Sequence, residues 1–132
     1  MQKGGFFTFV MSKATPGKEM DEMGDFIRGE NPSREEYEMS VACEEAYMNI
    51  CMHAYGEGKG PCLVRVFKGK QKITAVFVDC GKRYNPLKGA LPVFDKERVG
   101  GHGLRIMREY SKMVYLRMWG INLLKLERRE KT

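Results

Sequence analysis

The stretch Val41-Ala-Cys-Glu-Glu-Ala-Tyr-Met-Asn-Ile-Cys-Met-His-Ala-Tyr55 decides the fold, because it is a long apolar segment with polar residues at helical spacing. Glu45 and Asn49 are four residues apart, and His53 follows after four more, so their side chains share one stripe of a helix. A carboxylate or amide among apolar neighbours costs several kcal/mol unless a partner satisfies it. The stripe therefore indicates a site, and such oxygen ligands suit a metal ion that carries phosphate.

The composition predicts one compact domain. The chain has 132 residues, of which 42% are hydrophobic, enough for a single core. We expect one domain over residues 1–132, with its core at about 6–128. No apolar run is long enough to span a membrane, and the first residues do not read as a cleavable signal, so we expect a cytoplasmic protein without membrane contact.

Charge and cysteine content exclude little by themselves. The net charge is +6 and the pI near 9.2, but the basic residues are spread along the chain, so nucleic-acid binding is only weakly indicated. Cys43, Cys51, Cys62 and Cys80 form no C-x-x-C pair. They predict neither a zinc site nor a disulfide framework, and we expect all four to be small buried hydrophobes.

Apolar periodicity and turn residues predict an α+β domain. Ser33 and Glu36 form a capping box that opens the long central helix, and a charged tail from Glu127 is expected to fray. The other expected elements are strands at 6–11, 62–68, 72–79, 113–119 and 121–126, a helix from Thr15-Pro16 to Gly29, and a helix starting at 100–103. This order predicts a two-layer sandwich, with helices on one face of a mixed, mostly antiparallel sheet. The long connection at about 82–99 is expected to be a lid.

Three segments resemble the N, G1 and G2 boxes of the histidine-kinase-like ATPases, the Bergerat-fold group. They are Glu45-Ala-Tyr-Met-Asn49, Val78-Asp-Cys-Gly81 and Gly100-Gly-His-Gly-Leu104. The short chain and the form Asp-x-Gly-x-x-Tyr-Asn-Pro at 79–86 are most similar to the anti-sigma-factor serine kinases. The resemblance covers roughly residues 6–128 in consistent order, which makes it more specific than a lone glycine motif.

The resemblance implies roles for the first two boxes. Asn49 would hold Mg²⁺ against the triphosphate, and Glu45 would take the proton of the attacking hydroxyl. Asp79 would accept a hydrogen bond from the adenine amine, which favours ATP over GTP, and Gly81 would leave room for the ring. His53 receives no assigned role.

The third box would bind the phosphates. Gly101 and Gly103, with His102 and Leu104, would let backbone amides at the start of a helix approach phosphate oxygens. Arg98 is expected to reach the γ-phosphate when the lid closes.

The implied function is that of an ATP- and Mg²⁺-dependent serine/threonine protein kinase of bacterial regulation. It would phosphorylate an anti-sigma antagonist and sequester a sigma factor. Family members commonly act as dimers, and the strand at 6–11 is an edge that could pair in a homodimer. Two alternatives remain open: a non-catalytic partner-switching module that uses ATP to order the lid, and a basic nucleic-acid-binding domain.

Each box also has a plainer interpretation. Glu45 and Asn49 could be a satisfied structural pair, and Asp79 could end a strand in an Asx turn. The glycines at 100–103 could start a helix without binding a ligand. Position 83 is arginine, where many larger relatives have a second glycine. The joint occurrence of the three boxes in order favours the functional interpretation.

Overall fold

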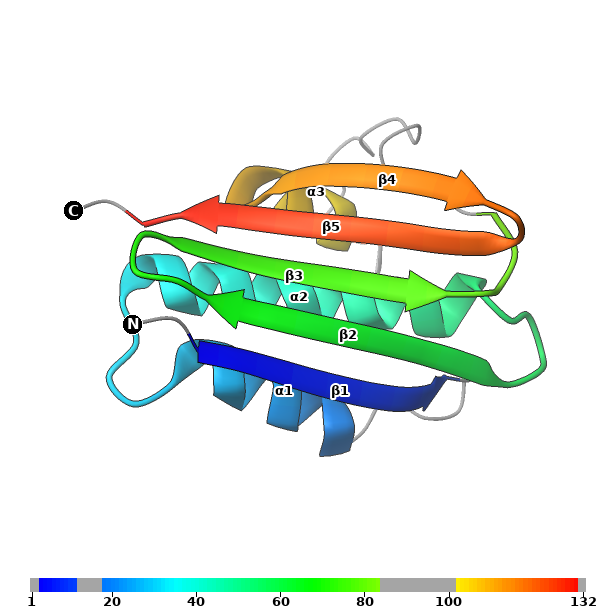
Figure 1. Cartoon of the computed structure of the whole chain (residues 1–132), viewed down its shortest axis with the longest axis horizontal. Coiled ribbons are helices and arrows are strands. Elements are labelled where there is room, and N and C mark those ends of the chain that lie inside the picture. Colours follow the sequence, from blue (N-terminus) through cyan, green and yellow to red (C-terminus); the bar gives the residue numbers. More distant parts are fainter. Residues whose placement is uncertain (1–2, 12–17, 84–101, 131–132) are drawn as a thin grey trace.

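A computed structural model describes residues 3–11, 18–83 and 102–130 (Figure 1). The elements follow in chain order as β1 (Lys3–Met11), α1 (Lys18–Arg28), α2 (Arg34–His53), β2 (Gly60–Lys68), β3 (Lys72–Asp79), α3 (His102–Tyr110), β4 (Lys112–Met118) and β5 (Ile121–Arg129). The bounds of β3 coincide with the prediction. The first helix begins at Lys18, and the expected N-cap Thr15 and Pro16 lie outside the described residues, as does most of the predicted lid.

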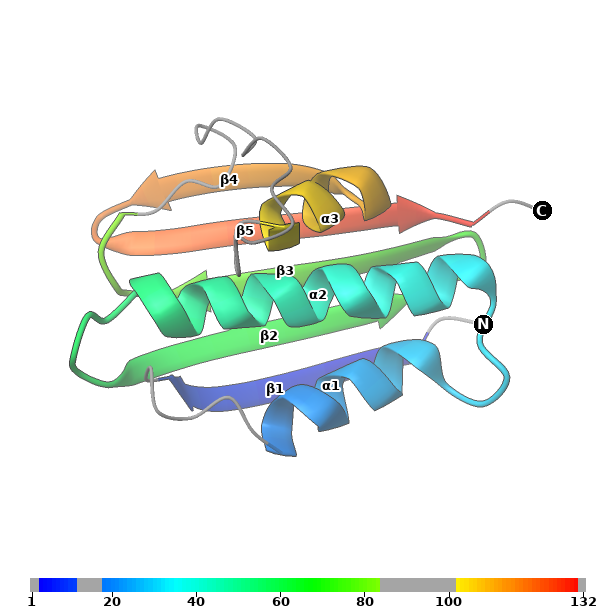
Figure 2. The same ribbon diagram turned by 180° about the vertical axis from the view of Figure 1, so that it is seen from behind.

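The α+β class and the two-layer arrangement are confirmed. The five strands form one sheet in the order β1-β2-β3-β5-β4, and all three helices cover the same face (Figure 2). Every pairing between the described strands is antiparallel. The prediction of a mixed sheet is therefore wrong for these strands. The parallel component is missing because β3 and β5, the only sheet neighbours that α3 separates in the chain, run in opposite directions.

The central helix α2 lies between α1 and α3 (Figure 2). Its capping box is confirmed: the Glu36 backbone N–H donates to the Ser33 hydroxyl at 3.1 Å, and the Ser33 N–H donates to the Glu36 carboxylate at 2.9 Å. Small buried residues along one stripe, such as Ala42 and Ala46, let the helix approach the sheet closely. The predicted start of this helix is therefore confirmed.

Aromatic packing fixes how α2 is rotated about its axis. The fully buried ring of Tyr47 meets Phe9 of β1 edge-to-face, with ring centroids 4.9 Å apart. With Tyr47 and Ile50 directed into the core, Glu45 and Asn49 come to lie on the flank of the helix and remain half-buried. The rotation of the helix thus places the polar stripe beside the core rather than within it.

The C-terminal segment differs from the prediction. Residues 127–129 do not fray, because β5 continues to Arg129. Glu127 pairs with Lys72 at 3.1 Å, and Arg128 reaches back to Glu38 of α2 at 2.8 Å. These ion pairs join β5 to β3 and to the helix layer. The charged composition of the tail does not reveal such pairings.

Of the four cysteines, Cys43, Cys51 and Cys62 are buried as expected, but Cys80 is exposed. The expectation was wrong for Cys80 because it follows the last residue of β3, where the core no longer covers the strand. No helix among the described residues is long and apolar enough to cross a membrane.

Candidate functional site

The end of β3 is joined to the end of α2 by backbone contact. The Lys82 N–H donates to the Ala54 carbonyl at 2.7 Å, at the C-cap of the helix. A Cβ on Gly81 would lie 2.2 Å from that carbonyl oxygen, so no larger residue fits there without displacing the chain. The glycine that the resemblance assigns to ligand space is thus required for packing. The close approach of Gly81 to Ala54 holds Asp79, two residues before Gly81, beside the last turns of α2.

A narrow crevice opens between the C-terminal half of α2 and the ends of β3, β4 and β5. It encloses about 390 Å³ not filled by atoms, part of it open to solvent. Its walls are apolar, and its polar groups include Asn49, His53 and Asp79 from the predicted site. The described residues that line it are Ala46, Asn49, Ile50, His53, Ala54, Asp79, Lys82, Tyr115, Asn122 and Leu124. Lys82, on one wall, is exposed.

Asp79 has one carboxylate oxygen bonded within the protein. Oδ1 accepts from the Gly81 backbone N–H at 2.9 Å and from Asn122 Nδ2 at 2.8 Å. The first bond is the Asx turn of the plainer interpretation, so that turn exists. Among the described residues, no donor is hydrogen-bonded to Oδ2. Since Asp79 is only 7% exposed and lines the crevice, this oxygen is an acceptor suited to a ligand.

Asn122 connects the site to the C-terminal hairpin, and sequence reasoning missed it. It is the direct partner of Asp79 on the neighbouring strand, β5, and is 4% exposed. Its Nδ2 also donates to the carbonyls of Gly81 and Lys82, at 3.2 and 3.1 Å. A polar residue at the inward position of an otherwise alternating strand is a signal that could have found it.

Two further side chains complete this network. The Tyr115 hydroxyl donates to Asn122 Oδ1. Arg117 Nη1 donates to the same oxygen at 2.8 Å and to the Gly81 carbonyl at 2.9 Å. The hairpin thereby fixes the amide of Asn122, and through it the orientation of the Asp79 carboxylate. Arg117 and Asn122 both bond to the turn that follows β3, through the carbonyls of Gly81 and Lys82.

Glu45 and Asn49 differ from their neighbours on α2 in lacking strong partners. Three nearby acids, Glu36, Glu38 and Glu44, each pair with a lysine or arginine. Within the described part of the chain, Glu45 has no ion pair or hydrogen bond. Asn49 has only a weak contact of its Nδ2 with the Met107 sulfur at 3.9 Å. Within the described residues, these two side chains therefore do not form the satisfied structural pair of the plainer interpretation.

The surroundings of Glu45 favour its neutral form. Partial burial raises the pKa of the Glu45 carboxyl above its ordinary value, and no cation among the described residues opposes the effect. Glu45 is on the same helix as Asn49 but does not line the crevice itself. It therefore lies beside the pocket rather than in its wall.

The remaining predicted residues belong to the lid and the third box. Arg98 and Gly101 lie outside the described residues. His102 and Gly103 form the first turn of α3, and Leu104 packs against the core. No group of three His, Cys, Asp or Glu side chains that could hold a metal is found in the described part of the chain.

Comparisons with known proteins agree with this geometry. The family model described as "Histidine kinase-like ATPase domain" matches residues 22–123, which include α2, β3 and the crevice between them. The serine/threonine-protein kinase BtrW of Bordetella bronchiseptica is 27% identical over 106 residues, covering 76% of this chain and 75% of that protein.

Proposed function

Because the chain belongs to the histidine kinase-like ATPase domain family, we propose that it binds Mg-ATP in this crevice and transfers the γ-phosphoryl group to a hydroxyl of a partner protein. One observation carries the proposal: Glu45 and Asn49 stand one helical turn apart without strong partners among the described residues, beside a crevice that contains the free oxygen of Asp79. Polar groups that are open to solvent beside a crevice can bind a ligand without breaking a bond within the protein.

Asp79 is proposed to select the base. Its Oδ2 would accept a hydrogen bond from the exocyclic amine of adenine, while guanine would present a carbonyl oxygen and repel it. The hydrogen bonds from Gly81 and Asn122 hold the carboxylate, so little orientational freedom is lost on binding. The crevice would accept the base between the apolar side chains of Ile50 and Leu124.

Asn49 is proposed to hold Mg²⁺ through its amide oxygen, for which the structure describes no competing donor. The ion would neutralise the charge of the triphosphate. Glu45, four residues earlier, would accept the proton of the attacking hydroxyl while the oxygen of that hydroxyl bonds to the γ-phosphorus. The bond from that phosphorus to the bridging oxygen would break, and ADP would leave. The raised pKa of Glu45 brings its basicity closer to what a general base needs near neutral pH.

The proposed substrate is a serine or threonine of an anti-sigma antagonist, and the proposed second partner is a sigma factor. The kinase name of the similar Bordetella protein supports the reaction class. The resemblance of the three boxes to anti-sigma-factor kinases supports the partners. A non-catalytic switching module would use the same crevice without Glu45 acting as a base.

Labelled ATP tests the proposal in two steps. Wild type should bind Mg-ATP and label a serine or threonine of a candidate antagonist, whereas Glu45→Gln should bind but not transfer. Glu22→Gln, an exposed glutamate on α1, is the matched control and should behave as wild type. Binding without transfer by wild type would favour the switching module, and no binding at all would reject the proposal.

A further inference from the structure

The turn that follows β3 is held at both ends by two adjacent residues at the end of α2. The Lys82 N–H donates to the Ala54 carbonyl at 2.7 Å. The Cys80 N–H donates at 3.0 Å to the hydroxyl of Tyr55, a side chain to which the proposed function gives no role. Gly81, between them, is held by the C-terminal hairpin. The backbone of the turn is therefore fixed residue by residue.

The Tyr55 hydroxyl forms a bridge where the ladder between β2 and β3 ends. The last pair of that ladder is Cys62 with Asp79, so the same register sets Pro61 opposite Cys80. The hydroxyl accepts from the Cys80 N–H and donates to the Pro61 carbonyl, as one proton and two lone pairs allow. A bridge through an oxygen is longer than a direct bond. It thus lets the chain leave the sheet directly after Asp79.

Packing fixes the ring of Tyr55 in this position. The ring is partly buried against the core, and a Cβ on Gly60 would lie only 2.0 Å from its Cε1 atom. The Tyr55 carbonyl accepts from the Gly58 N–H at 2.9 Å, which closes the connection from α2 to β2. Because the ring is already held, its hydroxyl is presented to the turn with little loss of conformational freedom.

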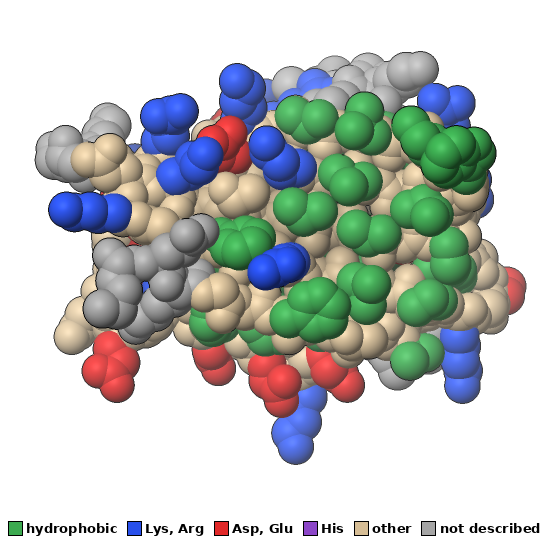
Figure 3. All heavy atoms as spheres, in the orientation of Figure 1, with side chains coloured by type: hydrophobic (Ala, Val, Ile, Leu, Met, Phe, Trp, Pro, Cys, Tyr) green, Lys and Arg blue, Asp and Glu red, His purple; other side chains and the backbone are tan. Residues whose placement is uncertain are grey.

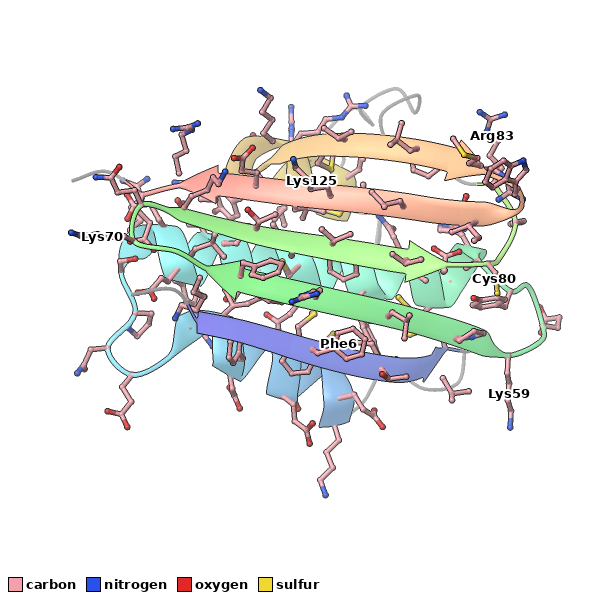
Figure 4. The ribbon with its side chains drawn as sticks, viewed as in Figure 1. Phe6, Lys59, Lys70, Cys80, Arg83 and Lys125 are labelled. Atoms are coloured by element: carbon pink, nitrogen blue, oxygen red, sulfur yellow. The ribbon has the colours of Figure 1, made fainter. Side chains whose placement is uncertain are left out.

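Apolar side chains lie beside the bridge. Figure 3 shows that the sheet face opposite the helices is largely apolar toward the end where β3 finishes. A hollow there is lined by Cys80 and by apolar side chains that include Val78 and Ile121. Figure 4 shows Cys80 at this end, near the connection that carries Lys59. Without the hydroxyl, the Cys80 N–H would have to bond to water or directly to the Pro61 carbonyl, and the turn would shift.

The same turn orients the Asp79 carboxylate. The N–H groups of Cys80 and Gly81 are consecutive donors, of which the first bonds to Tyr55 and the second, at 2.9 Å, to Asp79 Oδ1. A shift of the first therefore tilts the second. Since the bond to Oδ1 decides which way the carboxylate faces, the tilt also moves Oδ2 relative to the crevice.

We propose that Tyr55 is a positioning residue for base recognition, whose hydroxyl keeps the Asp79 carboxylate aligned with the adenine amine through the Cys80 N–H. This inference rests on the proposed function, in which Asp79 Oδ2 accepts from that amine. Tyr55 does not line the crevice, so it acts through the turn. Its effect should therefore fall on the choice of base, and not on the phosphates or on the ion that Asn49 would hold.

Titration calorimetry of the full chain with Mg-ATP and Mg-ITP tests the inference. Inosine has a carbonyl oxygen where adenosine has its amine, so ITP lacks the donor for Asp79. Wild type should bind ATP more tightly than ITP by roughly 10- to 100-fold. Tyr55→Phe keeps the ring over Gly60 but removes the bridge. It should weaken ATP binding by about 3- to 10-fold and leave ITP binding nearly unchanged.

Tyr37→Phe provides the matched control, because it makes the same chemical change at an exposed tyrosine of α2. It should keep the wild-type preference for ATP. A merely structural role of Tyr55 would weaken the binding of both nucleotides equally. That result, or an unchanged preference in Tyr55→Phe, would overturn the inference.

Amide hydrogen exchange of Cys80 gives a second measurement that needs no nucleotide. The Cys80 N–H should exchange about 10-fold faster in Tyr55→Phe than in wild type, whereas the Lys82 N–H, which is bonded to Ala54, should change less. Equal exchange of Cys80 in the two proteins would contradict the bridge. If wild type binds neither nucleotide, the proposed function fails and this inference with it; normal ATP binding with the same preference in Tyr55→Phe rejects this inference alone.

Discussion

Replacing Asn122 should show what its hydrogen bonds contribute to the stability of the protein, separately from the chemistry proposed for the site. Asn122→Ala removes the hydrogen bond to the Asp79 carboxylate and the bonds to two backbone carbonyls. A net contribution of about 1.5–3 kcal/mol for the bond to a charged group, and less for the others, gives an expected loss of about 2–4 kcal/mol. This is a large part of the 5–15 kcal/mol by which a domain of ordinary stability stays folded.

Asn122→Asp has a different signature, which makes the test specific. It keeps the acceptor for Tyr115 and Arg117 but sets a carboxylate 2.8 Å from Asp79 Oδ1 in place of the donor. Two buried carboxylates in contact raise the pKa of one of them above its value in the unfolded chain. The variant should be nearly as stable as wild type at low pH and should lose stability as pH rises through that raised pKa.

Urea unfolding at pH 5 and pH 8 measures both effects. Asn122→Ala should be destabilised to a similar extent at both values, whereas Asn122→Asp should be destabilised mainly at pH 8. Asn31→Asp makes the same chemical change at an exposed residue and should have little effect at either pH. An Asn122→Asp variant as stable as wild type at pH 8 would show that the amide does not hold Asp79, and the reasoning would fail.

Three other predictions concern the crevice. Glu45→Gln should abolish phosphoryl transfer while leaving the melting temperature unchanged or slightly higher. In wild type, a pH profile should show that transfer is lost as pH falls through the Glu45 pKa, which lies above the ordinary 4.5. Asp79→Asn should weaken ATP binding by roughly 10- to 100-fold in titration calorimetry and GTP binding much less; equal losses would contradict base selection. Gly81→Ala should cost several kcal/mol in denaturant unfolding because its Cβ meets the Ala54 carbonyl, whereas Gly4→Ala, which meets nothing within 4 Å, should be tolerated.

Local signals were sufficient for much of the fold. The capping box at Ser33, the helical spacing of Glu45 and Asn49, and the alternation that bounds β3 depend on neighbours in the sequence, and the structure has them as predicted. The expected fraying after Glu127 failed because its partners are distant. Lys72 is on another strand, and the choice between a strand and a free tail depended on that pairing.

The candidate site shows the same limit. Asp79 could be singled out from its motif, but the atoms that orient it come from the C-terminal hairpin, about forty residues later. Only the register between β3 and β5 places Asn122 opposite Asp79, and register cannot be read from either strand alone. The resemblance assigns Gly81 to ligand space, whereas the close approach of Ala54 requires a glycine there in any case.

A crystal structure with Mg²⁺ and a non-hydrolysable ATP analogue tests the central proposal most directly. The predicted result has the adenine amine bonded to Asp79 Oδ2, the ion held by Asn49, and the Glu45 carboxylate facing the γ-phosphate. A nucleotide bound elsewhere, or an adenine that does not contact Asp79 in the crevice, would contradict it.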